Sequence, residues 1–375
     1  MKFQKMLPAV LGLAFALCQI NSVAQTDKDT VRWDDRAGQW VYTLYNPSDL
    51  SRYKVERYTP RTLIEPQVSS SVRWDKDVYE YRYRIRNTNQ ARQSISEITV
   101  RAPKWDSPGV ERKPLASDLT SLQIIAISRA ERASEKAFVA KTLYSPHRWK
   151  PYLNVNNPSK VGFGWLADLQ KDYNGIAPRS SQGNFSVLRP ELPGAGWMQL
   201  QGDTPDLYNA AILPQSGVLA EQVAELLKND SVWVPVMLPA IVLPKPYDAA
   251  ELSRRLKDHI GTWPESGLID STVWAALAPK LDALTAALAV KDHKTARLTA
   301  QAVLAQVRIQ YAGVEEGRGD EDDEANDSRA SERQLLTARG TLETVSETMP
   351  PMQRVAVRAL TFNVRYLLER MESGR

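Results

Sequence analysis

The clearest alternation of apolar and polar positions lies in the segment YEYRYRIRN, residues 79–87. One set of alternate positions comprises Tyr79, Tyr81, Tyr83 and Ile85, and the other comprises Glu80, Arg82, Arg84 and Arg86. Successive side chains of a β-strand point to opposite faces, so each set occupies one face. The pattern predicts an antiparallel strand with tyrosines in the core and arginines in solvent. The alternative is a surface that grips an acidic polymer, which requires the aromatic rings outside, beside the cations.

Short apolar runs separated by turn residues surround this segment. The sequence VRWDDRAGQWVYTLYN predicts two strands with a turn at residues 35–38, and residues 94–100 are predicted to pair with residues 79–86 as a hairpin. Clusters of Gly and Pro between short runs favour a sandwich, so we interpret residues 30–214 as a β-sandwich-like domain or as two smaller β domains. The other predicted elements are a short helix at residues 117–133 and strands at residues 137–144 and 183–188.

The next part of the chain, residues 215–247, combines a short predicted helix at 218–228 with the apolar sequence SVWVPVMLPAIVLPKP. Its prolines, at positions 235, 239, 244 and 246, exclude a helix and a central strand. A free linker would not be this apolar, so we expect the segment to pack in extended form along the junction between two domains. The alternative is an apolar strip that binds a partner.

Residues 248–375 show helical periodicity. Pro279 suits the first turn of a helix, and Asp292 suits the cap of a second. Apolar residues recur every three or four positions and give each predicted helix one apolar face. The helices are expected to bury these faces against one another as an antiparallel bundle. In chain order the stripes are Leu281, Leu284 and Leu288; Ala296, Ala300, Val303, Val307 and Tyr311; Leu335, Ala338, Leu342 and Val345; and Met352, Val355, Ala359, Phe362 and Tyr366. The predicted fold is therefore α+β and multidomain, with an N-terminal antiparallel β-sandwich followed by a helical bundle.

The N-terminus predicts export. Residues 1–24 carry two lysines, an apolar run and small residues before Ala24, as a cleaved secretory signal peptide does. The apolar run is about half the ~20 residues that cross a bilayer, so we expect no transmembrane segment. The only cysteine, Cys18, would leave with the signal, which would exclude disulfides, thiolate nucleophiles and cysteine zinc sites from the mature chain. We expect a periplasmic or secreted protein.

Charge and motifs exclude several classes of function. The net charge of +4 from 48 basic and 44 acidic residues is too small for a nucleic-acid binder. The motifs of serine hydrolases, zinc metalloproteases, phosphate loops and dinucleotide-binding domains are absent. Ser51 and Lys54 have the spacing of a serine-lysine nucleophile, but the motifs that accompany such a pair are missing. The histidines His147, His259 and His293 are far apart in sequence, and we expect surface or capping roles for them. We therefore predict no catalytic residue and no cofactor.

The acidic run at residues 315–328 is the strongest candidate for a metal site. Asp320, Asp322 and Glu324 alternate as calcium ligands do. Ala325 stands where the EF-hand loop requires glycine, and Ser331 stands in place of its bidentate glutamate. We therefore expect a solvated loop between two helices and predict no metal site.

The helical part resembles the FIMAH-type domain of secreted bacterial proteins over residues 265–350. The first half resembles the β region of uncharacterised exported bacterial proteins: VYEYRYRIRN is similar to their YxYRYTVxN strand, and IAPRSSQGNFSVLRPELPG to a stretch near the end of that region. Arg179 departs from that pattern, since glycine is usual there. The resemblance implies architecture and export, and it brings no catalytic residue. The matching features of the helical part are Lys280 and Leu281 at a helix start, the turn from Leu288 to Asp292, Ala296, Val303 and Val307 on the next helix, and the segment ASERQLLTARGTLETV.

These observations favour a non-enzymatic binding or structural module of the bacterial envelope or extracellular space. Its expected partner is a protein or a polysaccharide, and not a nucleic acid. An alternative is recognition of an anionic polysaccharide by exposed aromatic residues together with Arg82, Arg84 and Arg86. A carboxylate-based glycoside hydrolase also stays open, because paired acids need not be close in sequence.

Overall fold

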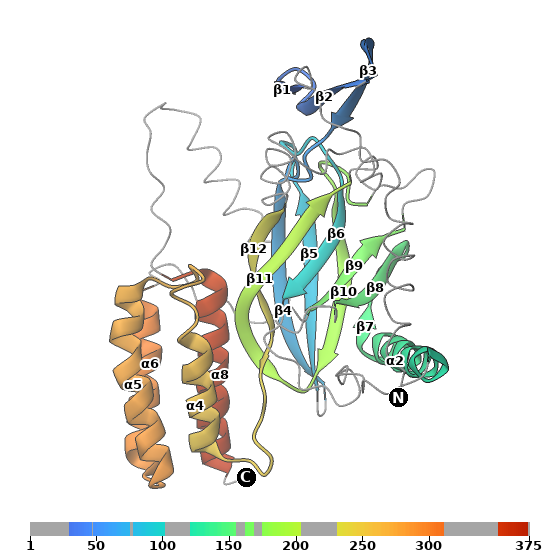
Figure 1. Cartoon of the computed structure of the whole chain (residues 1–375). Coiled ribbons are helices and arrows are strands. Elements are labelled where there is room, and N and C mark those ends of the chain that lie inside the picture. Colours follow the sequence, from blue (N-terminus) through green and yellow to red (C-terminus); the bar gives the residue numbers. More distant parts are fainter. Residues whose placement is uncertain are drawn as a thin grey trace, which may run out of the picture.

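A computed structural model of the chain describes most of the region between residues 30 and 373. It describes residues 30–46, 48–75, 78–101, 121–154, 162–168, 175–203, 231–310 and 352–373. They form an α+β structure in which antiparallel sheets precede a group of helices (Figure 1). Four predicted features lie outside the described residues: the signal peptide at 1–24, the short helix at 218–228, the acidic loop at 315–328 and the helix that carries Leu335 to Val345.

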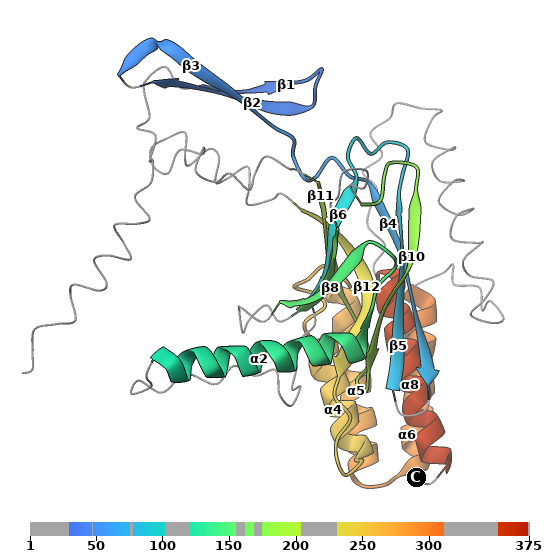
Figure 2. The same cartoon turned by 90° about the vertical axis from the view of Figure 1, so that its right-hand side faces the viewer.

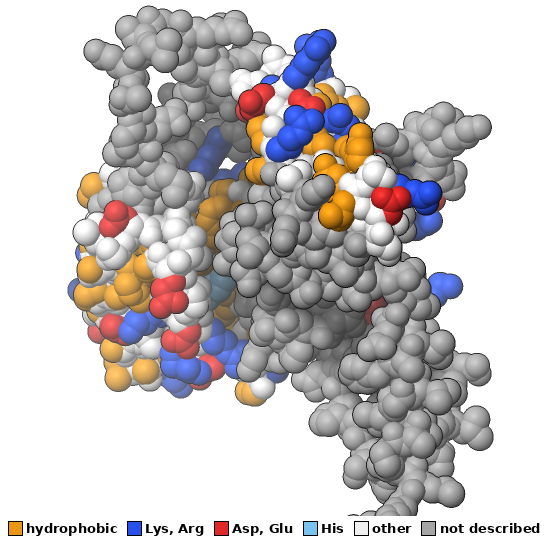
Figure 3. All heavy atoms as spheres, turned by 45° about the horizontal axis from the view of Figure 1, so that its top comes forward, with side chains coloured by type: hydrophobic (Ala, Val, Ile, Leu, Met, Phe, Trp, Pro, Cys, Tyr) orange, Lys and Arg blue, Asp and Glu red, His pale blue; other side chains and the backbone are white. Residues whose placement is uncertain are grey.

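The first three strands form a sheet of their own. β1 (Thr30–Asp34), β2 (Gln39–Asn46) and β3 (Asp49–Tyr58) pair in the order β1-β2-β3. The predicted turn at residues 35–38 is confirmed: Gly38 has a φ of 63°, and its N–H donates to the Asp34 carbonyl at 2.7 Å. This sheet stands beyond one end of the other sheets (Figures 1 and 2) and displays apolar and basic side chains side by side (Figure 3).

A second sheet contains the strand with the clearest alternation. It has the order β4-β5-β10-β7, with β4 at Pro66–Asp75, β5 at Val78–Asn87, β10 at Ser181–Arg189 and β7 at Leu143–Tyr144. The predicted faces of β5 are confirmed: its tyrosines and Ile85 are buried, and its three arginines are exposed. The strand predicted at residues 183–188 is also confirmed as the main part of β10.

A five-stranded sheet completes the sandwich. Its order is β12-β11-β6-β9-β8, with β12 at Val232–Ile241, β11 at Leu192–Gly202, β6 at Ile95–Arg101, β9 at Gly162–Ala167 and β8 at Trp149–Asn154. Aromatic rings from both sheets meet between them. The Trp165 ring centroid lies 5.9 Å from that of Tyr83 and 5.4 Å from that of Phe185. This contact is the centre of the core.

The predicted hairpin between residues 79–86 and 94–100 is wrong. β5 pairs with β4 and β10, whereas β6 pairs with β11 and β9 in the other sheet. The connection between them crosses the sandwich, and buried Asn87 stabilises it by donating from Nδ2 to the carbonyls of Gln93 and Ile176, at 2.7 and 3.0 Å. A central strand is buried on both faces, which explains why residues 94–100 alternate poorly.

The proline-rich apolar segment is extended, as predicted, and it is an edge strand of the five-stranded sheet. β12 pairs with β11 on one side only. On the other side the Met237 N–H donates to Ser70 Oγ at 3.0 Å, and the Met237 carbonyl accepts from the Tyr83 hydroxyl at 3.0 Å. Backbone groups of alternate residues point the same way, so Pro235 and Pro239 face this side too. Residues 232–241 therefore belong to the sandwich rather than to a linker.

One helix and one strand were predicted near residues 117–144. The helix is longer than expected: α2 runs over Ser121–Thr142. The strand predicted at residues 137–144 is wrong except for its last two residues, which form β7. Ala137, Ala140 and Lys141 are strong helix formers that extend the helix past the apolar pair Phe138 and Val139.

Four described helices form the C-terminal bundle. They are α4 (Ala249–Ile260), α5 (Ser271–Ala289), α6 (His293–Gln310) and α8 (Arg354–Ser373). The predicted apolar faces of α5 and α6 are buried within the described range, as are Met352, Val355 and Ala359 at the start of α8. None of the described helices has the length and apolar character needed to cross a membrane.

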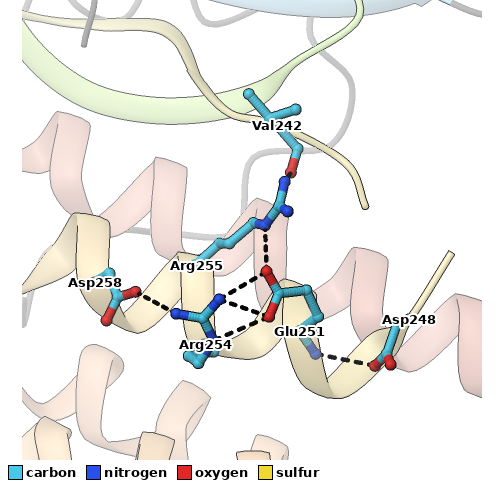
Figure 4. A network of polar contacts seen from close by, with 6 residues as sticks. All are labelled: Val242, Asp248, Glu251, Arg254, Arg255 and Asp258. Carbon is cyan, nitrogen blue, oxygen red and sulfur yellow. Dashed lines mark hydrogen bonds and ion pairs between the residues drawn. The ribbon is translucent and has the colours of Figure 1, made fainter. Parts of the chain in front are cut away.

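The helix starts follow local chemistry. Asp270 accepts from the Thr272 N–H at 2.9 Å, so α5 begins there and the placement of Pro279 in a first turn is wrong. The predicted Asp292 cap is confirmed, because its Oδ1 accepts from the Thr295 N–H at 3.1 Å. On α4, Asp248 caps the helix and Glu251 accepts from Arg254 and Arg255 at the surface (Figure 4).

The bundle is joined to the sandwich by polar contacts between distant parts of the chain. Arg358 of α8 donates to the Ser70 carbonyl at 3.1 Å, and Asn363 donates to the Pro193 carbonyl at 2.6 Å. These bonds fix α8 against β4 and β11. The bundle therefore lies beside the edge of the sandwich formed by β11 and β12 (Figure 1).

Arg179, where the resemblance makes glycine usual, has a φ of 66°. This is the left-handed region, which glycine adopts without a steric cost. The Arg179 N–H donates to the Thr88 carbonyl at 3.1 Å, and this bond holds the turn before β10. The backbone thus keeps the conformation that a glycine would favour.

Candidate functional site

The outer face of the five-stranded sheet carries an ordered row of side chains. The register aligns one residue from each strand: Trp233, Gln199, Thr99, Gly164 and Tyr152. With adjacent strands about 4.8 Å apart, the row spans roughly 19 Å. It has an aromatic ring at each end and polar or small residues between them, of which Thr99 is only 8% exposed.

A hydrogen-bonded group fixes the Tyr152 end of the row. The Tyr152 hydroxyl donates to Glu97 Oε1 at 2.8 Å and lies 2.6 Å from Thr99 Oγ1. Because the Tyr152 proton is directed to Glu97, Thr99 is the donor in the second bond. The ring lies over Gly164, where a Cβ would come within 2.8 Å of the Tyr152 ring and hydroxyl. Glycine at this position lets the tyrosine lie close to the sheet.

Two glutamines fix the middle of the face. Gln199 and Gln201 both donate from Nε2 to Ser231 Oγ, at 2.7 and 2.9 Å. The side-chain oxygen Oε1 of Gln201 accepts from Arg61 at 3.1 Å. These bonds hold the amide groups in defined orientations along the row.

The Trp233 end carries a cation. The Arg101 guanidinium lies over the Trp233 ring, 4.2 Å from its centroid, and donates to Gln199 Oε1 at 3.5 Å. Trp233 is 37% exposed, so its ring stays accessible beside the cation. Burial lowers the pKa of Arg101; arginine side chains nevertheless remain protonated in proteins. This end of the row therefore combines an accessible aromatic surface with a permanent positive charge.

The arginines singled out from the sequence lie on the opposite sheet. Arg82, Arg84 and Arg86 are exposed on the outer face of the four-stranded sheet, while the tyrosines of β5 face the core. Arg82 is paired with Glu80 at 2.7 Å. The structure therefore does not bring the predicted aromatic residues and arginines of β5 to a common surface.

The histidines lie in three different settings. His147 and His293 are exposed, which agrees with a surface role. The surface or capping role expected for His259 is wrong, because its ring packs at the bundle–sandwich junction beside Gly194. Trp263 donates from Nε1 to His259 Nε2 at 3.3 Å. Burial lowers the pKa of His259 to about 4, and a hydrogen bond with the Ala195 backbone acts in the opposite direction.

Neither the serine-lysine pair nor a metal cluster forms in the described residues. Ser51 lies in the part of β3 where the pairing with β2 shifts register, whereas Lys54 is paired with Leu44. The Ser51 hydroxyl instead donates to Asp49 at 2.6 Å. Within the described ranges no group of three or more His, Cys, Asp and Glu residues is placed to hold a metal ion.

A buried ion pair lies where β10 ends. Arg189 donates to both carboxylate oxygens of Glu191, at 2.8 and 2.5 Å, and the two side chains are only 4% and 10% exposed. The Arg189 guanidinium also lies 5.5 Å from the Phe138 ring centroid, so the pair ties α2 to the sandwich. The adjoining Glu191 carbonyl accepts from the Tyr81 hydroxyl at 2.6 Å.

The row on the five-stranded sheet was not predicted from the sequence. Its residues come from five strands spread between Thr99 and Trp233. One local signal was present: the sequence WMQLQG places Trp197, Gln199 and Gln201 on one strand face. Trp197 extends this face towards the bundle, where it donates to the Ser266 carbonyl at 3.1 Å.

Comparison with models of protein families, with curated proteins and with solved structures finds no match to this chain.

Proposed function

We propose that the protein is an exported, non-enzymatic binding protein and that the outer face of its five-stranded sheet binds a glycan chain. The observation that carries this proposal is the row from Trp233 to Tyr152, which places aromatic rings at both ends of a polar strip. A sugar ring has an apolar face of C–H groups and a polar rim of hydroxyls. Aromatic side chains pack against the apolar face of the sugar, and amides and hydroxyls form hydrogen bonds with its hydroxyl groups.

The order of the polar groups supports this proposal. Ser231 holds the amides of Gln199 and Gln201, and Glu97 holds the hydroxyl of Tyr152. Side chains that are already immobilised lose less conformational entropy when a ligand binds. A row of roughly 19 Å also suits an extended polymer better than a compact metabolite, which would be enclosed in a pocket.

The predicted location and architecture agree with this role. We propose that a signal peptide ending at Ala24 directs the chain to the periplasm or outside the cell, where polysaccharides of the envelope are accessible. We also propose that the helical part is a FIMAH-type domain that supports the sandwich or contacts an envelope protein. The bundle covers one edge of the sandwich, while the row lies across the face of the five-stranded sheet.

Replacement of Trp233 by Ala is expected to weaken glycan binding about 30-fold, because loss of an aromatic anchor costs about 2 kcal/mol. Binding can be measured by affinity electrophoresis and calorimetry against a panel of neutral and acidic polysaccharides. Circular dichroism of the variant checks that the sandwich remains folded.

The matched control is the variant in which Arg82, Arg84 and Arg86 are all replaced by Ser. It is expected to bind glycans as the wild type does, since these arginines lie on the other sheet. If the triple variant loses glycan binding while Trp233→Ala binds as the wild type does, the site lies at the three arginines instead. Release of reducing sugar that is abolished by Glu97→Gln would instead establish a glycoside hydrolase.

A further inference from the structure

The charge environment of Arg101 differs from that of the arginines that form surface ion pairs. Arg82 and Arg254 are paired with Glu80 and Glu251, each at 2.7 Å. In the part of the chain that the structure describes, Arg101 contacts an amide oxygen and an aromatic ring but no carboxylate. No carboxylate of the described residues therefore pairs with its positive charge.

The guanidinium is nevertheless held in place. The Trp233 ring supports it from one side at 4.2 Å, and Gln199 accepts one of its hydrogen bonds at 3.5 Å. Gln199 is itself fixed by its bond to Ser231. Cation–π contact and hydrogen bonding together orient a planar group that has five donors in a fixed arrangement.

The side chain of Arg101 is exposed. Its cross-strand neighbour on β9 is Gly162. A Cβ at Gly162 would meet backbone as its three nearest atoms, the closest being the Val100 carbonyl oxygen at 2.6 Å. Only glycine fits at position 162, and it presents no side chain to Arg101. A ligand group can approach Arg101 from the same face that carries the aromatic row.

We propose that Arg101 binds the carboxylate of an acidic sugar, so that the glycan recognised on this face is a polyuronate. This inference rests on the proposed glycan-binding function and names its ligand class. A guanidinium and a carboxylate are both planar and form two parallel hydrogen bonds. The Trp233 ring contacts the sugar that carries the carboxylate.

The test compares each polyuronate with its own carboxyl-reduced form, in which the carboxylate has become a neutral hydroxymethyl group. Polygalacturonate, polymannuronate and polyglucuronate are suitable probes, because they differ in the stereochemistry of the sugar. The wild-type protein is expected to bind one of them at least about tenfold more tightly than its reduced form. Arg101→Gln is expected to abolish this difference, because it removes the group that pairs with the carboxylate. The wild-type preference is also expected to shrink as salt is added.

The outcomes separate the two proposals. If Trp233→Ala weakens binding while Arg101→Gln keeps the preference for the carboxylated polymer, the assignment of Arg101 is overturned and glycan binding stands. If the protein binds dextran sulfate more tightly than any polyuronate through Arg101, the ligand is a sulfated glycan and the carboxylate assignment fails. If no polymer binds, both proposals are overturned. Arg82→Gln serves as the matched control, since it removes an exposed arginine on the opposite sheet.

Discussion

Replacement of Glu191 by Ala is expected to lower the free energy of unfolding by about 3–5 kcal/mol at neutral pH, because it breaks a buried ion pair. The Arg189 guanidinium would keep its place among apolar groups, including the Phe138 ring, after losing the carboxylate that receives two of its hydrogen bonds. Urea denaturation followed by both tryptophan fluorescence and circular dichroism gives the change in stability.

Two further variants separate burial from charge. In Arg189→Met/Glu191→Leu both charged partners become apolar, and this variant is expected to recover most of the lost stability. Glu251→Ala removes a carboxylate that also bonds two arginines, but on the surface of α4 (Figure 4), and is expected to cost much less. Equal losses for Glu191→Ala and Glu251→Ala would contradict the importance of burial.

Acidification is expected to destabilise the protein through His259. Its pKa in the folded state, about 4, lies below the ordinary value of 6.5, because burial disfavours the charged ring. Between these values the unfolded chain binds a proton that the folded chain does not. The contribution of His259 is therefore fully present above pH 6.5 and falls by about 2–3 kcal/mol as the pH decreases to about 4. Protonation at Nε2 would also remove the acceptor that Trp263 uses.

Carboxylates also titrate at acidic pH, so the contribution of His259 is measured as the difference in pH dependence between variants and the wild type. Stability in urea at several pH values is expected to fall less steeply for His259→Gln than for the wild type. His293→Gln, which alters an exposed histidine at the start of α6, is expected to keep the wild-type slope. A slope for His259→Gln that equals the wild-type slope would show that the ring is protonated in the folded protein.

The parts of the fold that sequence alone could predict are those set by local periodicity. The alternation of β5 and the three-and-four spacing of Leu281, Leu284 and Leu288 each identify a buried face. The caps at Asp292 and the turn at residues 35–38 depend on neighbours within four positions. Such features need no knowledge of distant residues.

The remaining features depend on contacts between distant residues. The connection after β5 has the composition of a hairpin turn, but Asn87 bonds Ile176, which lies 89 positions further along the chain. The candidate site is likewise a product of register, since Trp233 and Thr99 reach the same row only through β11. The unusual state of His259 also arises from packing, because the bundle presses its ring against Gly194.

The backbone hydrogen bonds on the outer side of β12 affect whether molecules of this protein can associate through their sheet edges. A strand at the edge of a sheet commonly offers free backbone groups to which a second chain can add, and this is a route to aggregation. Along the outer side of β12, Pro235 and Pro239 have no N–H to offer, and both backbone groups of Met237 are already bonded to Ser70 and Tyr83. An incoming strand would find no continuous ladder over residues 235–239. This edge of the sheet is thereby protected against edge-to-edge association without a charged residue within that stretch.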